Sequence, residues 1–276
     1  MTSQHSQLID FTGKVAVVTG GAGVLCSTLA KALANHGAAI ALLDVDLGLA
    51  RRVVAEIESS GGRAIALRAD VLDRSSLESA AQSILEIFGK VDILINGAGG
   101  TKKEATTGPS LSFFDLSEEA VRQVFDLNFM GTFLACQVFG RYMAEAGRGC
   151  ILNISSVAGL RPLTRSVAYS AAKAAVINFT QWLAVHLSQE YSANIRVNAV
   201  APGFFLTQQN RFLLLDERSG ELTERGAKIV AHTPVGHMGN PGDLVIPALM
   251  LLAAETGFTH GAILTVDGGF SAYPGV

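Results

Sequence analysis

A tyrosine and a lysine four positions apart could share proton chemistry. Tyr169 and Lys173 lie in the run AYSAAKAAVINFTQWLAVHL, whose composition favours a helix. Side chains at i and i+4 lie on one face of a helix, so the phenol and the ammonium would be neighbours. A nearby ammonium favours the tyrosinate, so we expect Lys173 to lower the pKa of Tyr169 toward neutrality and make it a general acid or base.

Two more polar residues are candidates for the same site. Ser156 follows the apolar run 150–155, which has the length of a buried strand, and Asn128 lies inside the long helical pattern 117–146. Taken singly, each residue has an ordinary alternative. Tyr169 and Lys173 could mark a solvated helix face, Ser156 could cap a strand end and Asn128 could be a polar kink.

A glycine-rich turn could bind a phosphate near the start of the chain. Residues 19–23, Thr-Gly-Gly-Ala-Gly, lie between an apolar run at 14–19 and a helical pattern at 25–35. Glycines let the backbone approach a pyrophosphate closely, and the helix N-terminus offers unpaired N–H groups and a positive dipole end. The turn predicts a dinucleotide site, with a purely structural tight turn as the alternative.

Asp44 indicates which dinucleotide would bind. It ends the apolar run 38–44, where a carboxylate can accept both ribose hydroxyls of an adenosine and repel a 2′-phosphate. The next residue is Val45, so no adjacent Arg or Lys would neutralise such a phosphate. NAD(H) is therefore favoured over NADP(H), and a surface aspartate that merely ends a strand is the alternative.

The elements that must position these residues alternate between two periods. Apolar runs of strand length occur at 14–19, 38–44, 64–67, 91–95, 150–155, 195–201 and 262–266. Helical patterns occur at 25–35, 47–60, 73–88, 117–146, 169–191 and 243–254. Strands apolar on both faces and joined by helices predict an α/β fold, a Rossmann-type doubly wound parallel sheet of about seven strands with helices on both faces. We expect residues 1–276 to form one dinucleotide-binding and catalytic domain, with an N-terminal tail over residues 1–12 or so.

Composition excludes several classes of protein. The chain of 276 residues carries a net charge of −3, which gives no electrostatic reason to expect nucleic acid or an anionic membrane as partner. Cys26, Cys136 and Cys150 form no CxxC pair, which argues against a disulfide framework, and no metal site is expected. No signal peptide or bilayer-spanning stretch is visible, so we predict a cytoplasmic protein that acts on a small molecule.

Together, these motifs resemble the short-chain dehydrogenase/reductase family over almost the whole chain. The matching pieces are residues 19–23, 70–71, 96–99, 128, 156, 169 with 173, and 202–203. Each piece alone is weak, but the ordered set is specific. The resemblance implies an NAD-dependent oxidoreductase that acts on CH–OH groups, and a homotetramer built on the helices 117–146 and 169–191.

The resemblance also implies a role for each matching residue. Tyr169 would exchange a proton with the substrate oxygen, and Ser156 would hydrogen-bond that oxygen. Lys173 would also hold the nicotinamide ribose, and Asn128 would hold a water that links Lys173 to solvent. Asp70 and Val71 would flank the adenine, and residues 96–99 would line its ribose side. The cofactor would contact Gly20, Gly21, Ala22, Gly23, Val24, Leu25, Asp44, Asp70, Val71, Asn96, Gly97, Ala98, Gly99, Tyr169, Lys173, Pro202, Gly203 and Phe205.

The chain departs from the family pattern at the turn. The common form TGxxxGxG has glycines where this chain has Val24 and Cys26, and the family's NNAG is NGAG here, with Gly97 in place of an asparagine. Cys26 puts a side chain where helix, strand and pyrophosphate come close. We therefore expect weaker cofactor binding than in a version with glycine at this position.

One branch of the family, that of D-mannonate oxidoreductase or fructuronate reductase, carries the resemblance further. The chain matches it in TGGAGVL, FFDLSEE, RPLTRSVAYSAAKAAVINFTQWLAVH, APGFFLTQQNRFLL and the C-terminal VDGGFSAYPGV. The implied reaction converts D-fructuronate and NADH reversibly to D-mannonate and NAD. Another sugar or polyol dehydrogenase, such as a gluconate 5-dehydrogenase-like enzyme, or a nucleotide-sensing protein without turnover, stays open as an alternative.

A hexuronate carries a carboxylate, which a cation or an N–H cluster must meet. We favour Arg161 and Arg211 for this role, because loops at the C-terminal edge of a parallel sheet bind ligands. Gln208, Gln209 and Asn210 are candidates for hydrogen bonds to sugar hydroxyls. All of these could equally be solvated surface residues, as could Lys102, Lys103 and Arg165. Residues 204–234 have the composition of a lid, which we expect to close over cofactor and substrate.

Overall fold

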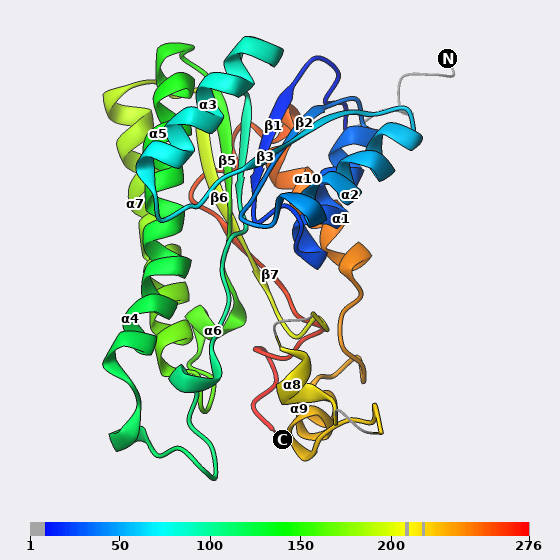
Figure 1. Ribbon diagram of the computed structural model, residues 1–276, viewed down its shortest axis with the longest axis vertical. Coiled ribbons are helices and arrows are strands. Elements are labelled where there is room, and N and C mark those ends of the chain that lie inside the picture. The colour runs from blue at the N-terminus through cyan, green and yellow to red at the C-terminus, as the bar shows by residue number, and fades with distance from the viewer. Residues whose placement is uncertain (1–8, 208–209, 217–218, 276) are drawn as a thin grey trace.

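The computed structural model describes residues 9–207, 210–216 and 219–275 (Figure 1). Its strands are β1 (Val15–Thr19), β2 (Ala39–Asp44), β3 (Arg63–Arg68), β4 (Ile93–Asn96), β5 (Gly149–Ile154), β6 (Ile195–Pro202) and β7 (Ile263–Val266). They form one parallel sheet in the order β3-β2-β1-β4-β5-β6-β7. The predicted Rossmann-type sheet of seven strands is therefore confirmed.

Helices cover both faces of the sheet (Figure 1). One layer contains α1 (Val24–Asn35), α2 (Leu47–Ser59) and α10 (Val245–Leu252). The opposite layer contains α3 (Arg74–Phe88), α4 (Glu118–Phe125), α5 (Gly131–Glu145) and α7 (Val167–Glu190). Each layer packs an apolar core against the sheet, so the central strands are buried on both sides and read as continuous apolar runs.

Local signals explain where several of these helices begin and end. Asp73 caps α3 by accepting hydrogen bonds from the N–H groups of Ser75 and Ser76. The helix ends at Gly89, whose φ of 80° lies in the left-handed region that glycine adopts without steric cost. Asp46 caps α2 in the same way, by accepting from the N–H of Leu49.

Some predicted boundaries are wrong. The single helix expected over residues 117–146 is divided by a π-helical turn, Asp126–Met130, between α4 and α5. The helix expected over 243–254 begins as a 3₁₀ turn at Pro241–Leu244, because a proline suits the first turn of a helix. Phe11, which the sequence places in a terminal tail, is 2% exposed and packs in the core of the α1 layer.

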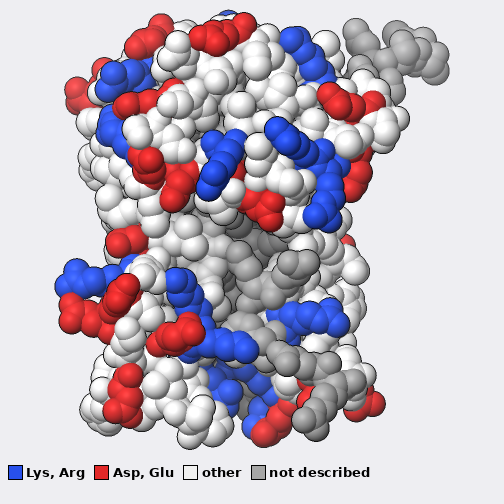
Figure 2. Space-filling model, viewed as in Figure 1, with Lys and Arg blue, Asp and Glu red and all other residues white. Residues whose placement is uncertain are grey.

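The C-terminal edge of the sheet carries three further helices among the described residues. These are α6 (Val157–Leu160), α8 (Arg211–Leu214) and α9 (Glu224–His232), which lie with the chain's C-terminal end in the lower part of Figure 1. The space-filling view is hollowed between this lower part and the sheet body, and both signs of charge are interspersed over the visible face (Figure 2). Within the described residues, no helix combines the length and apolarity needed to cross a membrane.

Candidate active site

The strand order reverses between β1 and β4, and the glycine-rich turn lies at this point. Thr19 at the end of β1 is level with Asn96 at the end of β4, so the segments that follow both strands are adjacent. Thr19 Oγ1 accepts hydrogen bonds from the N–H groups of Gly97 (3.2 Å) and Ala98 (3.4 Å). Ligands of doubly wound sheets bind at such a switch point.

The turn itself depends on close backbone approach. Gly20 has a φ of 60°, and a Cβ there would lie 2.7 Å from the Cα of Ala98. Gly23 precedes α1, whose first turn has neither a side-chain cap nor an acidic residue. The free N–H groups of this helix end therefore face the turn without a competing side chain.

Asp44 is fixed beside the turn. One carboxylate oxygen accepts from the N–H of Ala22 (3.0 Å) and the other from the N–H of Asp46 (3.0 Å). These bonds hold the carboxylate at the end of β2, where the sequence predicts a ribose contact. Each oxygen can still accept a further hydrogen bond.

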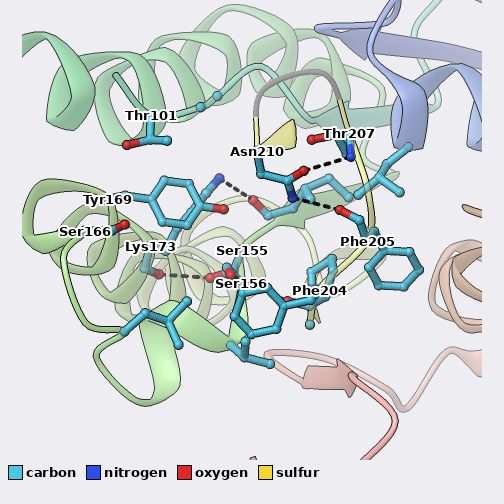
Figure 3. A pocket seen from close by; sticks show the side chains of 18 of the residues that line it. Thr101, Ser155, Ser156, Ser166, Tyr169, Lys173, Phe204, Phe205, Thr207 and Asn210 are labelled. Atoms are coloured by element: carbon cyan, nitrogen blue, oxygen red, sulfur yellow. Dashed lines mark hydrogen bonds between the residues drawn. The ribbon is translucent and has the colours of Figure 1, made fainter. Parts of the chain in front are cut away.

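Tyr169 and Lys173 lie together on the first turns of α7, as their spacing predicts (Figure 3). Lys173 Nζ is 5.6 Å from the centre of the Tyr169 ring and donates to the carbonyl of Ile154 at the end of β5 (2.8 Å). Ser156 begins α6, where its Oγ accepts from the N–H of Ala158 (3.2 Å), and it is hydrogen-bonded to Tyr169. The first turns of α7 and the start of α6 thus bring these three side chains to one place.

Asn128 connects this group to the segment after β4. It lies in the π-helical turn, is fully buried, accepts from the N–H of Gly100 (3.1 Å) and donates to its carbonyl (2.7 Å). A Cβ on Gly99 would lie 2.5 Å from Asn128 Oδ1 and 3.3 Å from Lys173 Nζ. The Asn128 and Lys173 side chains therefore both lie close to the backbone of Gly99, at a position where only glycine fits.

The electrostatics differ from the sequence prediction. Burial raises the pKa of Tyr169, and the hydrogen bond with Ser156 opposes that rise. Burial also lowers the pKa of Lys173 to about 8. The expected lowering of the Tyr169 pKa by Lys173 is absent from this arrangement of the described residues, where burial is the largest influence on the pKa of the phenol.

A cavity of about 180 Å³ opens above these residues. Its wall combines the catalytic candidates with Leu25 from α1, Pro202 and Gly203 after β6, and the segment that follows them. Asn210 lines it while its side chain accepts from the N–H of Thr207 (2.9 Å) and donates to the carbonyl of Phe205 (2.8 Å), as Figure 3 shows. The polar lining residues are Thr101, Ser155, Ser156, Ser166, Tyr169, Lys173, Thr207, Asn210 and Arg225.

Comparison with known proteins agrees with this geometry. The family model described as short chain dehydrogenase matches residues 14–218. The chain belongs to the short-chain dehydrogenase family. It is 48% identical to the uncharacterised oxidoreductase UxuB of Bacillus subtilis, over 97% of this chain and 98% of that protein.

Two solved structures of short-chain dehydrogenases are informative. A candidate D-mannonate oxidoreductase from Haemophilus influenza, with NAD bound, superposes with a TM-score of 0.91 at 43% identity, over 97% of this chain and 98% of that one. A candidate NAD(P)-dependent gluconate 5-dehydrogenase from Beutenbergia cavernae, with NADP bound, gives a TM-score of 0.84 at 30% identity, over 95% and 98%. This chain is thus an oxidoreductase of the family, similar to the D-mannonate branch.

The dehydrogenase site fits a bound dinucleotide in this chain. The uncapped start of α1, the close-packed Gly20 and the fixed Asp44 form a continuous path from the turn to the end of β2. From the other end of that path, Leu25, Gly97, Gly99 and Lys173 lead into the cavity. A pyrophosphate, a ribose and a nicotinamide would each find a matching group along it.

Two of the predicted cofactor contacts, Asn96 and Val71, have side chains that are buried outside the cavity wall. Asn96 is 2% exposed and donates to Asn153 Oδ1 (2.9 Å) inside the core, not toward the turn. Val71 is 5% exposed, and a Cβ on Gly131 of α5 would meet it at 2.6 Å. Their side chains are therefore structural, and only their backbones are left to contact a ligand.

The predicted substrate cations are not brought to the cavity wall. Arg161 and Arg211 are both exposed, and neither lines the cavity. Gln208 and Gln209, considered with Asn210 for sugar hydroxyls, lie outside the described residues. Arg225 of α9 lines the cavity instead, and its signal in the sequence is weak. It precedes the buried Ile229 by four positions, so both lie on one face of the helix.

Cys26 and Gly97, two of the three departures from the family pattern, lie in contact. Cys26 is 4% exposed, and a Cβ on Gly97 would overlap its Sγ. The thiol of α1 thus occupies the space that the missing side chain at position 97 leaves open. The Cys26 side chain faces the segment that follows β4. It would therefore affect the cofactor indirectly, through that segment.

Proposed function

We propose that this chain is an NAD(H)-dependent oxidoreductase that interconverts D-fructuronate and D-mannonate. The observation that supports it best is the meeting of Ser156, Tyr169 and Lys173 at one cavity beside the dinucleotide path. The similarity to a candidate D-mannonate oxidoreductase adds the substrate class.

In this proposal, the chain's residues manage the substrate oxygen and its proton. Ser156 Oγ donates a hydrogen bond to the ketone oxygen, and Tyr169 gives that oxygen its phenolic proton as the ketone becomes a secondary alcohol. Lys173 binds the nicotinamide ribose. Asn128 holds a water molecule that links Lys173 to solvent. The bound cofactor supplies or accepts the hydride at the carbon.

The cofactor preference rests on Asp44. Its carboxylate is held at the end of β2 by two backbone N–H groups, where it favours ribose hydroxyls and repels a 2′-phosphate. We therefore propose NAD(H) over NADP(H). The bound NAD of one similar structure agrees, whereas the bound NADP of the other is the contrary case.

The size of the cavity supports a small polar substrate. Its volume of about 180 Å³ is below the ~300–1,000 Å³ of pockets for drug-sized ligands, so a six-carbon sugar acid suits it better than a large apolar alcohol. We propose that residues 204–234 act as the lid, because Phe204, Thr207, Leu214 and Arg225 all line the cavity. A gluconate 5-dehydrogenase-like activity is the second candidate, favoured by the similarity to such a protein.

We further propose a cytoplasmic homotetramer. The outer face of α7 leaves Trp182 at 55% and Val185 at 56% exposed. Phe179, Trp182 and His186 stack in sequence along that face. A second copy packed there would bury these groups.

The test is NADH consumption with D-fructuronate, D-tagaturonate, 5-keto-D-gluconate and a simple ketone, with NADPH in parallel. Selective turnover of fructuronate with NADH supports the proposal, and selective turnover of 5-keto-D-gluconate would replace it with the second candidate. Tyr169→Phe keeps the ring but loses the proton. It should lower kcat by about 10²- to 10⁴-fold while NADH still binds. An active Tyr169→Phe enzyme would contradict the assigned role.

A further inference from the structure

Arg225 is the cation that the fold places at the cavity away from the catalytic lysine. In the described part of the chain, Lys173 and Arg225 are the two cationic residues that line the cavity. Lys173 is 4% exposed and bonded to the Ile154 carbonyl at the catalytic end. Arg225 belongs to α9, in the proposed lid, so it would approach a substrate from the lid.

Thr164 holds the guanidinium of Arg225 in place. It donates from Nη1 to Thr164 Oγ1 (2.9 Å) and from Nη2 to the Thr164 carbonyl (3.1 Å). Thr164 belongs to the segment between α6 and α7, so these bonds join the lid to the chain that leads into Tyr169. The other N–H groups of the planar guanidinium can still donate hydrogen bonds to a ligand.

The charge of Arg225 lacks a compensating carboxylate. Among the described residues, no acidic side chain forms an ion pair with it, and the preceding Glu224 is paired with Lys228 (2.6 Å). The charged group that acts on Arg225 is another cation, Arg165. Partial burial and this like charge both lower the pKa of Arg225, so the site is electropositive and incompletely neutralised.

Such a site favours a small anion with two oxygens. A half-buried guanidinium binds a carboxylate through two parallel N–H···O bonds, which an exposed lysine cannot reproduce. In D-fructuronate the ketone and the carboxylate lie near opposite ends of the carbon chain. A substrate with its ketone at Ser156 and Tyr169 can therefore extend its carboxylate toward the lid.

We infer that Arg225 recognises the carboxylate of the substrate and selects sugar acids over neutral sugars. The inference rests on the proposed function for the identity of the acid. It moves the carboxylate contact from Arg161 and Arg211, which the sequence favours, to the arginine that lines the cavity within the described residues.

The experiment compares Arg225→Gln, Arg225→Lys and the control Arg148→Gln, which removes an exposed cation outside the cavity wall and leaves the Glu224–Lys228 pair intact. Arg225→Gln should raise KM for fructuronate about 10- to 100-fold, because a charge-assisted pair is lost, with a smaller change in kcat. Arg225→Lys should recover part of this loss, and Arg148→Gln should match the natural enzyme. The KM for D-fructose, the neutral counterpart, should be the same in all four proteins.

Calorimetric binding of D-mannonate and of neutral D-mannitol, each with NAD present, separates the two proposals. If the natural enzyme fails to turn over fructuronate but prefers mannonate to mannitol, and Arg225→Gln abolishes the preference, the anion site stands and the proposed reaction fails. If fructuronate is turned over and Arg225→Gln leaves its KM unchanged, the assignment to Arg225 is overturned. If the natural enzyme neither turns over fructuronate nor prefers mannonate to mannitol, both the proposed reaction and the anion site are overturned.

Discussion

At the scale of single residues, the departures from the family pattern at Cys26 and Gly97 compensate each other. The Cys26 thiol fills the space above Gly97, so neither position can be changed without affecting the other. Gly97→Asn alone should destabilise the protein by about 1–3 kcal/mol through overpacking, and Cys26→Gly should relieve that cost. Unfolding in urea of both single variants and the double variant would give the coupling free energy.

We expect a coupling free energy of about 1–3 kcal/mol for this pair, as found for residues in contact. Strict additivity of the two changes would show that the contact carries no energy. NADH titration of the same variants tests the separate expectation that Cys26 weakens cofactor binding. Cys26→Gly should then bind NADH more tightly than the natural chain.

Burial of Lys173 makes stability depend on pH in a defined window. Its pKa falls from 10.5, the ordinary value for an exposed lysine, to about 8 in the folded protein. Between these values the unfolded chain binds the proton and the folded chain does not, so the contribution of Lys173 to stability rises with pH. This contribution is complete above pH 10.5 and is lost as the pH falls through 8.

Lys173→Met lacks this titration and provides the measurement. The free energy of unfolding of the natural protein, relative to Lys173→Met, should increase by about 3 kcal/mol from pH 7 to pH 10.5. Urea unfolding of both proteins across that range measures the difference at each pH. A constant difference would mean that Lys173 keeps an ordinary pKa in the folded state.

The neighbours of a site residue were predictable from the sequence where local spacing determines them. Tyr169 and Lys173 share a face because they are four positions apart on α7. The pKa of Tyr169 was not predictable, since it depends on burial by segments remote in sequence. The same holds for Arg225 and Thr164, which meet only when the lid folds onto the segment before α7.

At the scale of elements, periodicity and caps were enough to predict the sheet and most helices. Asp73 marks the start of α3 and Gly89 marks its end. Both ends were predictable because a side-chain cap and a left-handed glycine are local features. The π-helical turn within the pattern 117–146 was missed, since the residues of that turn keep a helical apolar pattern on either side. Such turns occur often at functional sites, and this one carries Asn128.

Asn128→Ala tests what that turn contributes. The change removes the hydrogen bonds to both backbone groups of Gly100 and the bond to the Val124 carbonyl (2.7 Å). Because the asparagine is fully buried, the unpaired groups should cost about 1–3 kcal/mol of stability. Urea unfolding measures this loss, with the exposed Asn35→Ala as control, and an effect no larger than the control's would contradict it.

At the scale of the molecule, one sheet edge assembles every part of the site. Parallel strands deliver the glycine turn, the segment after β4, Ser156 and the start of the lid to the same side, and helices on both faces keep the strands buried. The helices themselves are left with outer faces that play no part in the site. On α7 this outer face is apolar, which requires a separate explanation.

Trp182→Glu tests whether a second copy of the chain covers that face. Trp182 is 55% exposed beside the partly exposed ring of His186, so a carboxylate there is harmless in a monomer but would be buried in an assembly. Light scattering after size exclusion should show a tetramer for the natural chain and smaller species for Trp182→Glu. Phe258→Glu, which changes a fully exposed aromatic that is not part of α7, should remain tetrameric. Loss of the tetramer in both variants, or in neither, would place the contacts elsewhere, and a monomeric natural chain would leave the apolar face of α7 for another partner.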